Sequence, residues 1–232
     1  FGQGSTWNTV VDDIYILHQR LKQRYPDVPL CIMGHSMGSF LTRTYLIRYP
    51  GTVKAAVIMG TGWQPQAAIT GGLALANAIA AVSGENATSE LVTELAFGSY
   101  NKLFAPNRTK VDWLSADESN VDDYIADPLC GVDATVGLFR QMLHGIRFNQ
   151  RQSHLRQMDR EMPVLFVAGD KDPVGSCGKG VRQTYDAFRA AGMRDCTLKL
   201  YPGLRHEILN EKAYTADITK NIEAWLLSRL EK

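Results

Sequence analysis

The hydrophobic positions near the start of the chain follow the spacing of a helix. Val10, Ile14, Leu17 and Leu21 succeed one another at steps of four, three and four residues. This spacing brings the four side chains onto one face of an α-helix, because about 3.6 residues make one turn. We therefore expect a helix over residues 10–21 whose apolar face is buried against the rest of the protein.

Short apolar runs then alternate with a second helical segment. Residues 29–33 form an apolar run between Pro and Gly, which is typical of a strand in a parallel sheet that is covered on both faces. Such a strand would bury Cys31. The pattern next predicts a helix over residues 39–49 and a strand over residues 53–59. Strand, helix and strand together form the βαβ unit of a doubly wound sheet.

The alternation stops after this second strand. Residues 61–160 contain no convincing strand, and their apolar positions fall into helical groups. The clearest groups are Leu75/Ile79/Val82, Leu91/Leu95 and Val136/Phe139/Leu143/Ile146. We interpret this stretch as a helical cap inserted between a first core part, residues 1–60, and a second, residues 161–232. The Ala-rich segment 71–82 is interpreted as a packed cap helix rather than a lipid-facing one, and it is too short to span a bilayer.

Strand and helix alternate again after Pro163. The pattern predicts a strand over residues 164–168, a helix over residues 181–191 and a strand over residues 198–201. An amphipathic helix carrying Ile218, Ile222, Trp225 and Leu226 closes the chain. The fold class is therefore α/β, with a mostly parallel, doubly wound sheet and an inserted helical cap.

The charge and the cysteine content limit the kinds of ligand that the chain is expected to bind. Lys and Arg number 25 against 24 acidic residues, a net charge of +1, so the chain lacks the basic patch that nucleic acid would require. A small, neutral or weakly charged substrate fits better. The cysteines, Cys31, Cys130, Cys177 and Cys196, form no metal-binding spacing. We interpret them as free thiols in a reducing cytoplasm, with Cys177 and Cys196 able to pair only if the fold brings them together.

The segment Gly34-His35-Ser36-Met37-Gly38 carries the strongest chemical signal. It matches G-x-S-x-G and lies between a predicted strand and a predicted helix, where a sharp turn would lift the Ser36 hydroxyl out of the sheet as a nucleophile. We expect Gly34 and Gly38 to be required because larger side chains would clash there. The helix that begins at this turn leaves the N–H of Met37 without an intrahelical acceptor, so Met37 is the expected oxyanion donor.

A serine hydroxyl needs a base to remove its proton, and in this kind of fold an acid and then a histidine follow the serine along the chain. Asp170 and Asp172 both come after the strand predicted at residues 164–168, at the carboxyl edge of the sheet. We choose Asp172, and Asp170 remains the competitor, with turn capping as its other role. His206 lies in the loop after the next strand and is the expected base. The remaining histidines are interpreted as structural: His18, His35, His144 and His154.

Three segments together resemble the monoacylglycerol lipase and lysophospholipase-like branch of the α/β-hydrolases, also called the serine aminopeptidase family. They are Gly34-His35-Ser36-Met37-Gly38, Gly169-Asp170-Lys171-Asp172-Pro173-Val174 and Arg205-His206-Glu207-Ile208-Leu209-Asn210-Glu211. The resemblance covers nearly the whole chain. It implies hydrolysis of carboxylic esters, often monoglycerides or lysophospholipids, through an acyl-enzyme and without metal or organic cofactor. A helical cap of this kind would supply an apolar acyl pocket and contact a membrane surface transiently.

The chain departs from the family pattern in two places. Ser39 stands where many relatives have a second glycine, a change that a small residue should tolerate. Family members also carry several strands and a His-Gly oxyanion loop before the segment that the first five residues resemble. We therefore expect the native protein to be longer than this chain and to hold its second oxyanion donor in that additional part.

Two other functions remain open. A peptidase that releases N-terminal residues could use the same triad, and an acidic clamp for the substrate amine would favour it. The candidate clamp residues are Asp117, Glu118, Asp122 and Asp123. A binding module could also keep this fold without catalysis, because a fold does not by itself determine a function.

Overall fold

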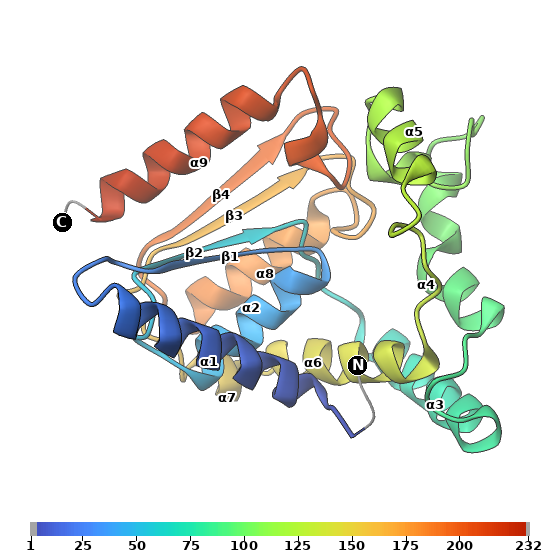
Figure 1. Cartoon of the computed structure of the whole chain (residues 1–232), viewed down its shortest axis with the longest axis horizontal. Coiled ribbons are helices and arrows are strands. Elements are labelled where there is room, and N and C mark those ends of the chain that lie inside the picture. The colour runs from blue at the N-terminus through green and yellow to red at the C-terminus, as the bar shows by residue number, and fades with distance from the viewer. Residues whose placement is uncertain (1–3, 231–232) are drawn as a thin grey trace.

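The computed structural model describes residues 4–230, and its centre is a sheet of four parallel strands (Figure 1). In spatial order the strands are β1 (Cys31–His35), β2 (Ala55–Met59), β3 (Val164–Gly169) and β4 (Cys196–Tyr201). Their bounds lie within two residues of those expected from the hydrophobic pattern. Because all four strands are parallel, their carboxyl ends meet at one edge of the sheet.

Helices cover both faces of the sheet, and alternate strand residues point to one face or the other. One face packs against α1 (Trp7–Arg24), α2 (Met37–Arg48) and α8 (Lys179–Ala190), and the other packs against α9 (Thr215–Leu230). In β2, Ile58 belongs to the hydrophobic cluster on the side of α1, α2 and α8, whereas Val57 and Met59 belong to the cluster on the side of α9. The α/β fold class is thereby confirmed.

All the helices between β2 and β3 lie within residues 61–160, the segment that was predicted to form a cap. They are α3 (Gln66–Ser83), α4 (Glu90–Lys102), η1 (Asp112–Leu114), α5 (Glu118–Ala126), α6 (Val136–Asn149) and α7 (Gln152–Leu155). Figure 1 shows α3, α4 and α5 beyond the carboxyl ends of the strands, while α6 runs back beneath α2. The division at residues 61–160 stays a prediction, since α6 also packs closely on Trp7 of α1.

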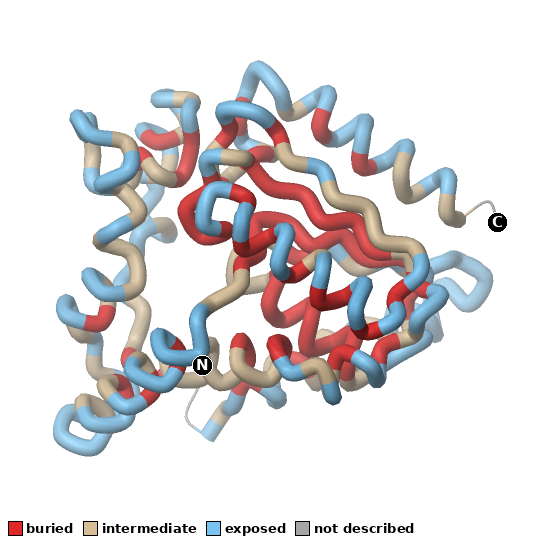
Figure 2. The backbone as a smooth tube through the Cα atoms, turned by 180° about the vertical axis from the view of Figure 1, so that it is seen from behind, coloured by how far each residue is buried: buried red, intermediate tan, exposed pale blue. Residues whose placement is uncertain are grey.

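The first strand is less covered than the sequence predicted. Every residue of β2 and β3 is buried, and these central strands stand out in Figure 2 as buried backbone. In β1, by contrast, Cys31 is exposed and Met33 is 51% exposed. The expectation that this strand is covered on both faces is wrong. Met33 is in register with Val57, whose side chain faces α9, and the described cluster on that face contains no residue of β1.

Two helices also differ from expectation. In α1, Trp7 and Val11 are buried, whereas Leu17 and Leu21 are exposed. Farther along the helix it is Tyr15 and His18 that pack against Tyr45 of α2, so Leu17 lies off the packed face. The predicted segment 71–82 is part of α3, which has 18 residues and is therefore long and apolar enough to cross a membrane by length and composition. The expectation that it is too short is wrong, although one such helix is weak evidence for a span. Ile69, Leu73 and Ala76 of α3 are buried, and most of the helix surface is exposed.

Candidate active site

Ser36 occupies a sharp turn between β1 and α2. Its backbone has a φ of 53° and a ψ of −120°, and residues with a side chain are rare at positive φ. The N–H of Ser36 donates a hydrogen bond to the carbonyl oxygen of Met59 at 3.1 Å, which holds the turn at the carboxyl end of β2. The Ser36 side chain makes no capping hydrogen bond to α2, so helix capping does not account for its hydroxyl.

The two glycines of this turn have different roles. A Cβ on Gly34 would lie 2.2 Å from the carbonyl oxygen of Gly38 and 2.4 Å from Oγ1 of Thr42, so the turn requires glycine at position 34. A Cβ on Gly38 would meet no atom within 4 Å among the described residues outside its own helix. The expected steric reason for Gly38 is therefore wrong, because its Cα faces open space at the start of α2.

Asp172 and His206 are brought together from the loops after β3 and β4. Nδ1 of His206 lies 3.0 Å from Oδ2 and 3.1 Å from Oδ1 of Asp172, and the two residues are 3% and 0% exposed. A carboxylate can only accept hydrogen bonds, so Nδ1 is the donor, and in the neutral imidazole Nε2 is then the nitrogen with the free lone pair. The N–H of Val174 donates to Oδ1 of Asp172 at 2.9 Å, which further stabilises the charged carboxylate.

Asp170, the competing acid, has a different partner. Its Oδ1 accepts a hydrogen bond from the N–H of Gly203 at 2.8 Å, in the turn that follows β4. Asp170 thus supports the beginning of the loop that carries His206, whereas Asp172 contacts the imidazole itself. The tertiary structure distinguishes two acids that are only two residues apart.

The turn of Ser36 and the loop of His206 meet at the end of β2. A Cβ on Gly60 would lie 3.1 Å from Cε1 of His206, and Gly60 directly follows Met59, whose carbonyl binds the Ser36 N–H. Met37 is the first residue of α2, so its N–H has no intrahelical acceptor and is available beside Ser36. A serine hydroxyl, an imidazole–carboxylate pair and a backbone N–H are therefore all supplied by one edge of the sheet.

The sequence of this chain matches a known protein family. The model of the family described as "Serine aminopeptidase, S33" matches residues 1–213. The chain belongs to the S33 family. This membership confirms the resemblance that the three sequence segments indicated.

Relatives and solved structures agree with this assignment. The S33 protein is 30% identical to a monoacylglycerol lipase of Mycolicibacterium smegmatis over 223 residues, which cover 95% of this chain and 70% of that lipase. A carboxyl esterase from Bacillus coagulans has a similar structure, with a TM-score of 0.89, 23% identity, and coverage of 97% of this chain and 72% of the esterase. A monoacylglycerol lipase from Paleococcus ferrophilus has a TM-score of 0.71, with 18% identity, 97% coverage of this chain and 76% of that lipase. The shared fold is that of the α/β-hydrolases.

His35 of the S33 protein supports the site in a way that the sequence pattern did not reveal. Its Nε2 lies 3.0 Å from the carbonyl oxygen of His206, and the two imidazole rings are 4.6 Å apart. Burial lowers the pKa of His35, and the neighbouring His206 lowers it further. Its imidazole is therefore neutral at pH 7 and can donate Nε2–H to that carbonyl. The only sequence signal was its position next to Ser36.

Arg43 is a second residue that the sequence analysis missed. It lies in α2, is 0% exposed, and donates hydrogen bonds to Oγ1 of Thr61 (3.3 Å) and to the carbonyl oxygen of Gly62 (2.9 Å). Burial lowers the pKa of its guanidinium to about 9. Arg43 thereby anchors the segment that leads from the end of β2 to the first helix of the cap. No periodicity or motif marked this arginine, because its partners lie on another loop.

An apolar cavity of ≈ 380 Å³ lies among α3, α4 and α6. Large apolar and aromatic side chains make up most of its wall, among them Leu75, Leu95, Phe97, Tyr100, Phe139 and Leu143. Burial, with a contribution from the charge of Asp172, raises the pKa of Tyr100 to about 12. The ring of Tyr100 lies 5.3 Å from that of Trp113, which lies 5.2 Å from the imidazole of His206, so this end of the cavity is one side chain away from the Asp172–His206 pair. The cavity can hold an uncharged, apolar group.

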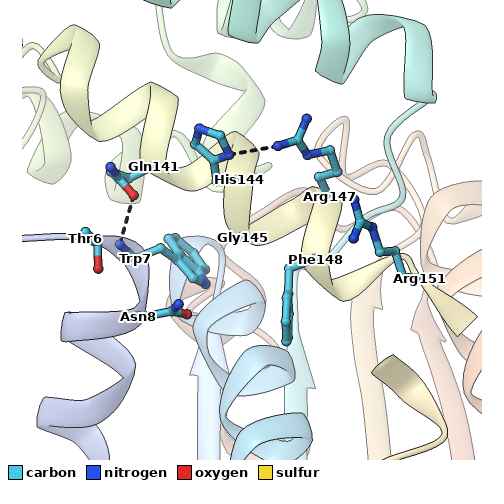
Figure 3. Close-up of a pocket in the computed structure, with 9 residues that line it drawn as sticks. All are labelled: Thr6, Trp7, Asn8, Gln141, His144, Gly145, Arg147, Phe148 and Arg151. Atoms are coloured by element: carbon cyan, nitrogen blue, oxygen red, sulfur yellow. Dashed lines mark hydrogen bonds between the residues drawn. The ribbon is translucent and has the colours of Figure 1, made fainter. Parts of the chain in front are cut away.

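A separate polar pocket of ≈ 310 Å³ lies on the opposite side of α6 (Figure 3). Arg147 donates a hydrogen bond to Nδ1 of His144 at 3.1 Å, and burial and Arg147 lower the pKa of this histidine. A Cβ on Gly145 would lie 2.1 Å from the indole of Trp7, so the glycine allows α6 to pack on α1. His144 and Gly145 thus have structural partners of their own, away from Ser36.

The acidic residues considered as an amine clamp have local partners. The pairs are Glu118 and Asp122 with Arg108 (3.9 and 2.7 Å), Asp123 with Lys212 (3.3 Å), and Asp117 with the N–H of Ser119 (2.9 Å).

Within residues 4–230, no group of three or more His, Cys, Asp or Glu side chains is arranged to hold a metal ion. The four cysteines are free, and burial raises the pKa of the Cys196 thiol to about 11.

Proposed function

We propose that this S33 protein hydrolyses carboxylic esters with apolar acyl chains, of the monoacylglycerol or lysophospholipid kind, with Ser36 as nucleophile. The observation that carries the proposal is the buried hydrogen bond between His206 Nδ1 and the Asp172 carboxylate at 3.0 Å. Because Nδ1 donates this bond, Nε2 is the nitrogen of the neutral imidazole that can take a proton from a serine hydroxyl. The names of the relatives, monoacylglycerol lipase and carboxyl esterase, favour the same substrate class.

The chemistry follows from these groups. His206 removes the proton from the Ser36 hydroxyl, and the oxygen attacks the ester carbonyl while Asp172 stabilises the imidazolium that forms. The N–H of Met37 stabilises the negative charge on the carbonyl oxygen. His206 then protonates the leaving alcohol, which departs and leaves an acyl-Ser36 ester. Water activated by the same imidazole attacks this ester and releases the fatty acid.

The apolar cavity fits the acyl part of such a substrate. Its wall carries no Lys, Arg, Asp or Glu side chain among its lining residues, so it favours an alkyl chain over a charged one. Burial of each methylene contributes about 0.8 kcal/mol, which is enough for a few carbons to determine substrate preference. The peptidase alternative is less favoured, because the acids that would bind an amine are already paired with Arg108 and Lys212.

Labelling with a fluorophosphonate probe tests the function. The probe loses fluoride when an activated serine hydroxyl attacks its phosphorus, and we expect one label per chain on the peptide that contains Ser36. Mass spectrometry of the digested protein would locate it. The Ser36→Ala variant serves as the control and should remain unlabelled. An unlabelled wild-type protein would instead support a binding module, and labelling that persists in the variant would mean that another nucleophile is responsible.

We also propose that the cap contacts a lipid surface transiently. Large apolar side chains are exposed on its outer surface, among them Val82, Leu91, Leu95, Leu129 and Val132. Leu95 also lines the apolar cavity, so a lipid surface at this point would lie at the cavity wall. The acidic residues of α5 favour neutral over anionic lipid.

Sedimentation with phosphatidylcholine vesicles tests this contact. The double variant Leu91→Ser/Leu95→Ser should bind about a hundredfold more weakly than the wild type or worse, because burial of each of the two leucine side chains contributes about 1.5–3 kcal/mol. Leu227→Ser is the matched control, since Leu227 is 49% exposed on α9, away from the cap. Equal binding by all three proteins would exclude this surface.

A further inference from the structure

A continuous row of aromatic rings leads from the apolar cavity to His206. Phe97 and Tyr100 line the cavity, and the indole of Trp113 stacks on Phe97 with ring centroids 6.1 Å apart and planes 7° from parallel. Tyr100 meets the same indole edge-on, at 5.3 Å. The indole is also 5.2 Å from the imidazole of His206. Trp113 therefore adjoins the cavity wall on one side and the imidazole on the other.

Hydrogen bonds connect the segment around Trp113 to the loop around His206. The guanidinium of Arg205 donates to the carbonyl oxygens of Asp112 and Ser115, the latter at 2.9 Å. The N–H of Glu207 donates to the carbonyl oxygen of Leu114 at 2.8 Å. Both neighbours of His206 thus hold the residues that flank Trp113. The segment that carries Trp113 and the loop that carries His206 are therefore held side by side.

The buried carboxylate of Glu211 adds two more hydrogen bonds to this connection. It is 3% exposed, and its carboxylate accepts hydrogen bonds from the N–H groups of Ala116 at 2.8 Å and Asp117 at 3.1 Å. Hydrogen bonds to a charged acceptor are stronger than those between neutral groups. Residues 112–117 of the cap are therefore attached to the loop of His206 by hydrogen bonds that involve Arg205, Glu207 and Glu211.

We propose that Trp113 is a positioning residue that couples filling of the cavity to the orientation of His206. This inference rests on the proposed function, because it concerns the same ester hydrolysis. An acyl chain that fills the cavity packs on Phe97 and Tyr100 and keeps the indole against the imidazole. A short acyl chain leaves these rings free to shift, and a misplacement of about 1 Å in a reacting group can lower a rate by about 10²-fold. Longer acyl chains are thus turned over faster, in addition to binding more tightly.

Steady-state kinetics with nitrophenyl acetate and nitrophenyl octanoate test the coupling. In the wild type, kcat should be higher for the octanoate. Trp113→Leu should lower kcat for the octanoate by about tenfold or more and leave kcat for the acetate within about twofold. Trp113→Phe, which keeps an aromatic ring, should retain most of the octanoate kcat. Trp225→Leu is the matched control: Trp225 lies in α9 and donates to Thr197, so this variant should keep the wild-type dependence on acyl length.

Three results would overturn the coupling. A wild-type kcat that does not depend on acyl length removes the effect to be explained. An equal loss of kcat for both esters in Trp113→Leu means that Trp113 is needed only for the fold, which urea unfolding of the variant would show directly. An increase in KM for the octanoate with kcat unchanged means that Trp113 is only part of the cavity wall. In each case fluorophosphonate labelling of Ser36 in the wild type would still support ester hydrolysis, whereas its absence would remove the proposed function itself.

Discussion

Replacement of Ser36 by alanine should lower kcat/KM for nitrophenyl butyrate by about three orders of magnitude or more. The variant loses the oxygen that attacks the ester, and the imidazole of His206 then has no hydroxyl to activate. The fold should be unaffected, because the Ser36 side chain makes no capping hydrogen bond to α2 and alanine is no larger. Hydrolysis would be followed by release of nitrophenolate, and stability by urea unfolding.

A second serine provides the control for this experiment. Ser153 is exposed in α7, so Ser153→Ala removes the same hydroxyl group at a position away from the carboxyl edge of the sheet. Its kcat/KM should equal that of the wild type. If Ser36→Ala retains activity within about tenfold of the wild type while remaining folded, Ser36 is not the nucleophile.

Replacement of Asp172 by asparagine should lower kcat by about 10⁴-fold near neutral pH. Asparagine keeps the shape of the side chain, and its carbonyl oxygen can still accept the N–H of Val174, which binds Oδ1 of Asp172 at 2.9 Å. Its amide would then donate to Nδ1 of His206, so the proton of the imidazole would move to Nε2. In that tautomer Nε2 cannot accept the proton of Ser36.

Asp170→Asn is the matched control for this prediction. Asp170 accepts a hydrogen bond from the N–H of Gly203 at 2.8 Å, and the carbonyl oxygen of asparagine can accept the same bond. Its kcat should remain within a few-fold of the wild type. Measurement of kcat for both variants with one ester distinguishes the two acids, and the reverse result, an inactive Asp170→Asn beside an active Asp172→Asn, would exchange their roles.

Much of the fold could be predicted because the relevant signals are local. The strands β2 and β3 are continuous apolar runs with every residue buried, and such runs between turn residues favour central strands of a parallel sheet. The loops of Ser36, Asp172 and His206 could be identified because each follows a predicted strand. Parallel strands end at the same edge, so three segments far apart in the sequence were expected to converge.

Other features could not be predicted, because they depend on which segments become neighbours. The apolar run of β1 resembles those of β2 and β3, yet Met33 is 51% exposed, because the described cluster under α9 contains no residue of this strand. Leu17 and Leu21 share a helix face with Val10 and Ile14, but α2 contacts this part of α1 through the neighbouring His18, and the two leucines stay exposed. Helical periodicity identifies which face is apolar, and the neighbouring elements decide how much of that face is covered.

The sequence by itself determined the alternation of strands and helices, the turn that carries Ser36 and the positions of Asp172 and His206 after predicted strands, because each of these depends on residues close together along the chain. Only the tertiary structure decided that Asp172 rather than Asp170 contacts His206, and that His35 and Trp113 adjoin the same imidazole. These are contacts between separate loops, whose relative positions depend on strand order and helix packing. Hydrophobic spacing contains no information about such distances, so these roles became evident only from the three-dimensional arrangement.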